Sequence, residues 1–309
     1  MKSAATTPWR SLLLTVLILG SLSCATHGSS DKKRSKAYRD INAIGHRVIG
    51  FQSGLGNWYS LDKERQIGAQ VSAEYEKSTS LLQDATTQAY LDRMGQTIAL
   101  NSDTQFPITI RVVDSEDSFA LTLAGGYQYI SRGLLLQMEN EGELAGAIAR
   151  GIAHTSLRSA TGLATRASLM EAMTVPVIFG ANSTSGQDFS VPLTLIKFRR
   201  DDESPADYFG VQYLYKSGYA PECFISFVQK VWPPQTQPTA KAFSPFPLVP
   251  ERLEALRKEI SEILPKQNTA VTNTENFLAL REHLLSLAPP PKATPKKPTL
   301  LRPDSQKLN

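Results

Sequence analysis

Histidine and carboxylate side chains are the types in this chain that could do chemistry, and one histidine and two carboxylates in two separate segments are the candidates considered first. His154 lies in a stretch whose apolar residues recur with helical spacing, and Glu203 and Asp207 stand four positions apart further along the chain. Imidazole nitrogens and carboxylate oxygens bind metal ions and transfer protons. A single histidine on a helix is more often a core residue than a ligand, so these residues form a site only if the fold brings them together.

Apolar periodicity predicts a mostly helical body with a small sheet placed before a central helix. The residues around His154 predict that this central helix covers about 139–158. Alternating apolar and polar residues predict strands at 107–113 and 127–131. The weakly patterned stretch 174–192 predicts a long loop that acts as a lid. The other expected helices cover about 61–77, 85–100 and 203–217, and two more begin at Pro221 and Pro250.

The composition excludes several kinds of protein. The 309 residues, 41% apolar and 20% charged, fit a soluble body of one or two domains. Four histidines and two cysteines exclude a disulfide scaffold and a protein with several zinc ions. Residues 1–38 carry a net charge of +5 and residues 289–309 carry +4, which leaves −5 for the middle of a chain whose total is +4. An acidic body without a basic stripe predicts no nucleic acid partner.

The N-terminus has the features of an export signal. Basic residues flank the start of an apolar run over 12–22, which is too short to span a bilayer and typical of a signal peptide. Ser21-Leu22-Ser23-Cys24 resembles a lipobox, so we expect residues 1–24 to be a signal peptide of the lipoprotein type. Two alternatives remain open: ordinary signal peptidase cleavage at Ser23-Cys24-Ala25, and an uncleaved membrane anchor.

The rest of the chain divides into three parts. Residues 25–44 are expected to be a polar tether, residues 45–288 the one domain that carries the function, and residues 289–309 a disordered tail rich in proline and lysine. A lipidated Cys24 would hold the domain to a membrane. Because Ala25 rather than aspartate follows Cys24, resemblance to bacterial lipoproteins implies the periplasmic side of the envelope, at the outer membrane.

A series of short motifs occurs in a characteristic order over about residues 58–260. These motifs are Tyr59-Ser60-Leu61 with Glu64 and Gly68, Ser118-Phe119-Ala120-Leu121, Gly125-Gly126-Tyr127, Glu143-Leu144-Ala145-Gly146, His154, Glu203 with Asp207, and Gly218-Tyr219-Ala220-Pro221. This order resembles the HtpX/BepA-type zinc metallopeptidases, which are related to the CAAX prenyl proteases. The resemblance implies a helix-dominated α+β fold, of the zincin-like metallopeptidase type, with a small sheet packed on the central metal-site helix.

The resemblance also assigns roles, and this chain retains only part of the set. In the family, H-E-x-x-H supplies two zinc ligands and a general base, E-x-x-x-D supplies the third ligand and an orienting aspartate, and a later histidine in S-x-H-P lies near the metal. His154, Glu203 and Asp207 match this pattern. The first histidine is replaced by Arg150, the base by Gly151 and the later histidine by Phe246. Arg252 follows Phe246 at the family's spacing, so the alignment there is not shifted.

These replacements predict that zinc chemistry is lost. Arginine stays protonated and has no lone pair for a metal ion, and glycine cannot accept a proton. His154 and Glu203 are two ligands, whereas a catalytic zinc site normally has three from the protein. We therefore expect no zinc cofactor, with Arg150 in place of the metal ion and paired with Glu203 or Asp207. The alternative is that Arg150 turns to solvent and Glu203 is hydrated.

Loss of catalysis leaves open whether the chain still binds polypeptide. Gly125, Gly126 and Tyr127 match the start of the family's edge strand, where a substrate chain pairs through its backbone. The alternative is an ordinary pair of hairpin glycines. We expect an exported pseudo-peptidase of envelope protein quality control, which binds unfolded or extended envelope polypeptide without cutting it.

The sequence leaves two other functions open. The chain would be an active zinc metalloendopeptidase if other side chains, such as His46 or His283, completed the ligand set. It would be a purely structural lipoprotein if its own lid filled the groove.

Overall fold

The computed structural model describes residues 37–50, 57–169, 179–180, 193–232 and 249–288. The signal peptide with Cys24, most of the tether and of the expected 174–192 loop, Phe246 and the 289–309 tail lie outside these residues. Within them, the fold is the predicted helix-dominated α+β arrangement. The elements are η1 (Ile41–Ala43), α2 (Leu61–Ser78), α3 (Ala85–Leu100), β1 (Thr109–Val113), β2 (Ala120–Thr122), η2 (Ala124–Gly126), β3 (Tyr127–Ser131), α4 (Arg132–Gln137), α5 (Glu141–Ser156), α6 (Ser159–Leu169), β4 (Phe179–Gly180), α7 (Leu193–Lys216), α8 (Glu222–Val231), α9 (Val249–Glu262) and α10 (Glu275–Ser286).

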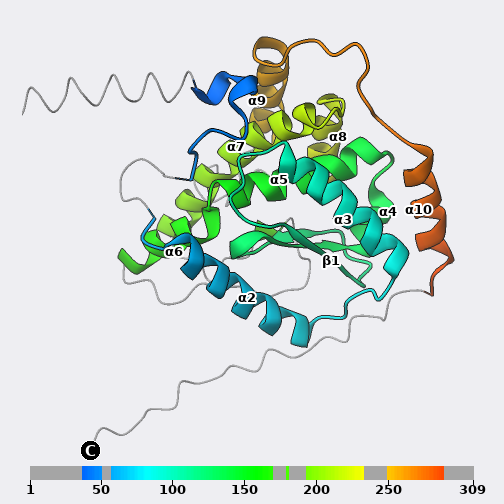
Figure 1. The fold of residues 1–309 in the computed structure, drawn as a ribbon, viewed down its shortest axis with the longest axis horizontal. Helices are drawn as coiled ribbons and strands as arrows, with labels where there is room; N and C mark the ends of the chain where they lie inside the picture. Colours follow the sequence, from blue (N-terminus) through cyan, green and yellow to red (C-terminus); the bar gives the residue numbers. More distant parts are fainter. Residues whose placement is uncertain (1–36, 51–56, 170–178, 181–192, 233–248, 289–309) are drawn as a thin grey trace, which may run out of the picture.

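Helix α5 lies at the centre of the fold, and all of its residues are buried. Its N-terminus is capped by Asn140, whose side chain accepts a hydrogen bond from the backbone N–H of Glu143. Figure 1 shows the sheet on one side of α5, with α2 beyond it, and α7 and α8 on the other side. The sheet therefore packs on the central helix, as the sequence predicts.

The sheet has the order β1-β3-β2-β4 among the described residues. β1 and β3 are parallel, with Ile110 opposite Gln128, and β2 is antiparallel to β3, with Thr122 opposite Gln128. β4 pairs antiparallel with the other side of β2. Strand β3 thus lies inside the sheet, and its successive side chains point to opposite faces of the sheet.

Helix α7 differs from the prediction at its start. It begins at Leu193 and runs through Pro205, whereas the sequence predicts a start at 203. Asp201 and Asp202 resemble the acidic first turn of a new helix, and a proline commonly marks such a turn. These signals are local, so packing of a long helix against α5 overrides them.

An N-terminal strap, residues 38–50, crosses α7 and belongs to the folded body. Ile41 and Ile44 are 8% and 6% exposed and contribute to the core. The ring of Tyr38 packs edge-on against Phe209 of α7. The packed body therefore includes residues 38–44, which the sequence assigns to the tether, because its two isoleucines are too few to show a periodic pattern.

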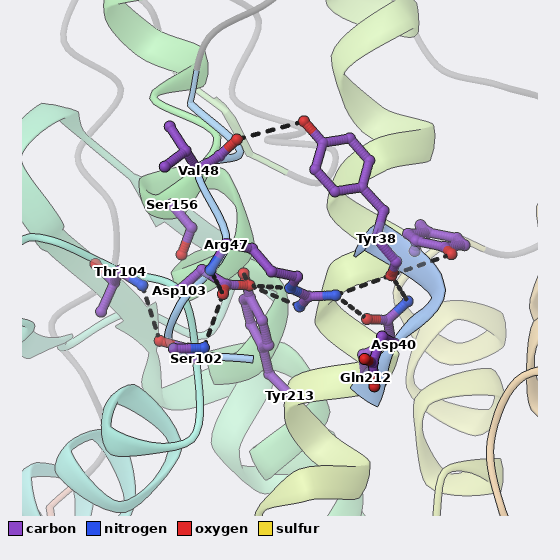
Figure 2. A network of polar contacts seen from close by, with 12 residues as sticks. Tyr38, Asp40, Arg47, Val48, Ser102, Asp103, Thr104, Ser156, Gln212 and Tyr213 are labelled. Carbon is purple, nitrogen blue, oxygen red and sulfur yellow. Dashed lines mark hydrogen bonds and ion pairs between the residues drawn. The ribbon is translucent and has the colours of Figure 1, made fainter. Parts of the chain in front are cut away.

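A buried polar network holds this strap in place (Figure 2). Arg47 donates from Nε and Nη2 to Asp103 Oδ2 at 2.9 and 2.6 Å, and its Nη1 donates to Tyr38 O and to Gln212 Oε1. Tyr213 donates its hydroxyl to Asp103 at 2.8 Å. The Arg47 and Asp103 side chains are 1% and 0% exposed, so each charge depends on the other.

Substitution Arg47→Met is expected to lower the free energy of unfolding by about 3 kcal/mol, because it leaves the Asp103 carboxylate buried without its counter-charge. Urea denaturation of the whole chain measures this difference. The matched control is Lys77→Met, which removes an exposed ion pair with Glu74 and is expected to change stability by less than about 0.5 kcal/mol. Equal losses in the two variants would contradict this account of the strap.

Glu259 of α9 makes the stability of this region depend on pH. Its Oε1 accepts a hydrogen bond from Gln212 Nε2 at 2.7 Å. Burial raises the pKa of Glu259 to about 7, although Gln212, Arg39 and Arg47 oppose this shift. A carboxyl group whose pKa is higher in the folded state stabilises the fold at acidic pH, and this contribution is lost as the pH rises towards 7.

Substitution Glu259→Gln is therefore expected to raise the melting temperature most at pH 7 to 8 and least near pH 5. Differential scanning fluorimetry across this range tests the expectation against Glu254→Gln, an exposed glutamate on the same helix. A constant difference between wild type and Glu259→Gln at all pH values would show that the Glu259 carboxyl does not titrate in this range.

Candidate functional site

Helices α5 and α7 bring the sequence-predicted site residues together. Arg150, Gly151 and His154 lie on α5, and Glu203 and Asp207 lie one turn apart on α7. The two helices approach closely because Gly210 of α7 has no side chain, and a β-carbon there would lie only 3.2 Å from Arg150 Cα. The residues of the two segments are therefore neighbours in the fold.

The guanidinium of Arg150 forms ion pairs with both carboxylates. Its Nη2 donates to Glu203 Oε2, and its Nε donates to Asp207 Oδ1 at 3.2 Å. Arg150 is 7% exposed and Glu203 is 0% exposed. Burial lowers the pKa of Arg150 to about 10, which still leaves the side chain charged at neutral pH. The predicted ion pair is confirmed, and the alternative with Arg150 in solvent is wrong.

A second arginine completes the group from the other side. Arg252 of α9 donates from Nε and Nη2 to the two oxygens of Asp207 at 2.7 and 2.8 Å, in a bidentate pair. The guanidinium carbons of Arg150 and Arg252 lie 4.7 and 4.3 Å from the ring centroid of Trp232, which follows α8. We call Arg150, Glu203, Asp207 and Arg252 the arginine–carboxylate cluster. The cluster joins α5, α7 and α9, and its four formal charges cancel.

His154 lies beside this cluster and close to Glu203. Its Nε2 is 4.0 Å from Glu203 Oε2, and its Nδ1 is 3.3 Å from the hydroxyl of Ser159. The two family ligands that the chain retains thus face one site. The described residues hold no group of three histidine, cysteine or acidic side chains placed to bind one metal ion.

The residues present do not fit a zinc ion. Glu203 Oε2, the oxygen nearest to His154, accepts a hydrogen bond from Arg150. A metal ion at this oxygen would have to displace a guanidinium and would meet its positive charge. His283, one of the alternative ligands, lies on α10 and contacts Asp84 at 3.0 Å, beside α3. Phe246 lies outside the described residues, and His46, the other alternative ligand, lies on the strap beside Arg47.

The expectation that Gly125, Gly126 and Tyr127 begin an edge strand is wrong. β3 is paired on both sides, with β1 and with β2. The glycines make the turn between β2 and β3. Gly125 and Gly126 have φ angles of 72° and 92°, which residues other than glycine rarely adopt. Local sequence could not show which strands lie beside β3, since strand order depends on contacts between distant segments.

The outer strands of the sheet are also covered along part of their length. On β2, Leu121 and Thr122 pair with Gly180 and Phe179 of β4. On the outer side of β1, Leu82 N and the side chain of Gln88 donate hydrogen bonds to backbone carbonyls of the strand. Any further strand at either edge would therefore compete with groups of this chain.

Three contributors to the site carry no motif that sequence reasoning could use. Trp232 lies outside every matched motif, and the sequence distinguishes Arg252 only by its spacing from Phe246. The third contributor is Gln128 of β3. A β-carbon on residue 151 would come within 2.6 Å of the Gln128 amide, which shows that this amide lies directly against Gly151. Contacts between a strand and a helix from different parts of the chain leave no spacing signal.

Comparison with known proteins identifies relatives of this arrangement. The sequence profile of peptidase family M48 matches residues 85–260. The chain is 24% identical over 193 residues to a beta-barrel assembly-enhancing protease of Yersinia pestis, covering 58% of this chain and 40% of that protein. It is 22% identical over 257 residues to the protein of the same name from Escherichia coli (strain K12), covering 76% of this chain and 51% of that protein. The chain thus spans about half the length of these relatives or less.

Substitution Arg150→Met is expected to lower the free energy of unfolding by about 3–5 kcal/mol, because the fully buried Glu203 carboxylate loses its counter-charge. Replacing both partners, Arg150→Met with Glu203→Gln, is expected to recover about half of this loss or more. Urea denaturation of the two variants and of Glu203→Gln alone completes a double-mutant cycle. Additive losses would mean that Arg150 and Glu203 do not stabilise each other.

Proposed function

This chain belongs to peptidase family M48, as an HtpX/BepA-type member, and we propose that it binds extended polypeptide in the bacterial envelope without hydrolysing it. The proposal has two parts, the loss of zinc-dependent hydrolysis and the retention of polypeptide binding. Each part is supported by a different feature of the site and is tested by a different measurement.

The observation that carries the proposal is the ion pair between Arg150 and Glu203. M48 peptidases depend on zinc, and in this chain the one acidic family ligand is bound to an internal cation. Gly151 supplies no group to accept a proton from water. Hydrolysis would also need a third ligand, and the described residues hold no group of three histidine, cysteine or acidic side chains that could bind one metal ion.

Retained binding is supported by the outer edge of β2. Leu121 and Thr122 hold an extended segment, β4, in antiparallel pairing. Backbone pairing of this kind depends on the N–H and C=O groups of the strand and needs no metal ion. An extended polypeptide would use the same edge and would compete with β4. We therefore propose β2, and not the strand that Gly125–Tyr127 introduces, as the strand that binds polypeptide.

The envelope location is supported by the export signal expected at residues 1–24 and by the relatives. The proteins of Yersinia pestis and Escherichia coli are named for enhancing beta-barrel assembly, so we propose unfolded envelope polypeptides as the ligands. Attachment to the outer membrane through a lipidated Cys24 is part of the proposal. Among the described residues, no helix combines the length and the hydropathy that a membrane span requires.

Purified full-length protein is expected to bind a fluorescein-labelled peptide of about twelve alternating apolar and polar residues, and to leave unfolded casein uncut with or without added zinc. The double variant Phe179→Pro/Gly180→Pro removes both β4 backbone donors and is expected to raise peptide affinity several-fold in fluorescence anisotropy. The control, Phe179→Ala, keeps these donors and is expected to bind like wild type.

Two results would overturn the proposal. Chelator-sensitive cleavage of casein with one zinc ion per chain would show an active metallopeptidase that uses unconventional ligands. Failure of both wild type and the proline variant to bind peptide would leave a structural lipoprotein as the better account.

A further inference from the structure

Gly151 stands in the interior of the buried central helix, where glycine is the least favourable residue after proline. Some other interaction must therefore favour it. A β-carbon on residue 151 would lie 2.6 Å from Oε1, 2.7 Å from Cδ and 2.9 Å from Nε2 of Gln128. The whole terminal amide of Gln128 thus lies against the bare backbone of Gly151.

The backbone of Gln128 is held in the sheet, so its amide can leave Gly151 only through a change of side-chain rotamer. Gln128 lies on the internal strand β3, between Ile110 of β1 and Thr122 of β2, and is 3% exposed. Its Nε2 is buried and has no hydrogen-bond partner within the described part of the chain. Hydrogen bonding from Nε2 therefore does not hold the amide in this position. The amide lies there because Gly151 leaves space for it.

The amide also suits the charge of the site. The two arginines and two carboxylates of the arginine–carboxylate cluster already balance. A glutamate at residue 151, as the family has, would add a negative charge that no group in this cluster compensates. A neutral amide fills volume without adding charge.

We propose that Gln128 occupies the volume of the lost general base, so that the site is rebuilt as a closed structural core. Arg150 supplies the charge that a metal ion would bring, and Gln128 supplies the bulk of the missing residue-151 side chain. Gly151 is then a requirement of the rebuilt site. This inference rests on the proposed loss of hydrolysis and predicts that residues 128 and 151 are coupled.

The coupling is tested by placing Gly151→Ala in two backgrounds, with Gln128 and with Gln128→Ala. In the Gln128 background, Gly151→Ala is expected to lower the melting temperature by about 3 °C or more, although alanine is the better helix former. In the Gln128→Ala background the same change is expected to raise it, because the methyl group then enters free space. Equal changes in both backgrounds would overturn the proposal.

A pair of larger substitutions separates volume from charge. In the Gln128→Ala background, Gly151→Gln returns an amide to the site and is expected to recover most of the lost melting temperature. Gly151→Glu has the same size but adds a charge, so it is expected to stay several degrees lower at pH 8. Equal melting temperatures for these two variants would show that the site does not select a neutral side chain.

Zinc binding provides a readout that is independent of catalysis. The variant Arg150→His/Gly151→Glu/Gln128→Ala is expected to show a larger zinc-induced rise in melting temperature than Arg150→His/Gly151→Glu, in which Gln128 still obstructs residue 151. An equal rise in the two variants would contradict the obstruction. The peptide-binding assay is unaffected by either outcome, so failure of this inference is distinguishable from failure of the proposed function.

Discussion

The site depends on one electrostatic constraint, which is that a fully buried carboxylate needs a positive charge beside it. Glu203 is 0% exposed, and the cost of leaving such a group ionised and unpaired is several kcal/mol. In a zinc peptidase the metal ion meets this need. Here the guanidinium of Arg150 supplies a positive charge from the neighbouring helix.

This constraint explains why the second carboxylate and the second arginine remain. Asp207 accepts hydrogen bonds from both Arg150 and Arg252, and the ring of Trp232 lies against both guanidinium groups. Removing one member would leave a charge without compensation. The orienting aspartate of the family therefore has a structural use here that does not require catalysis.

The sequence predicts the elements better than their arrangement. The long helices α2, α3 and α5 follow from apolar periodicity, and the pairing of Arg150 with Glu203 follows from the chemistry of the replaced residues. The short strands β2 and β4 have too few residues to show a period, and the internal position of β3 depends on partners distant in the chain. The contact of Gln128 with Gly151 has the same origin, because it joins a strand and a helix that no local spacing in the sequence relates.

The strap would have a mechanical consequence if the N-terminus carried the membrane attachment that we propose. Tyr38 O accepts hydrogen bonds from Arg47 and Gln212, and Arg47 is in turn paired with Asp103. A pulling force applied at the start of the described chain would be transmitted to α7 through the hydrogen bonds of Gln212 to Tyr38 and Arg47. Since α7 also carries Glu203 and Asp207, tension on the tether would load the same helix that holds the buried charges.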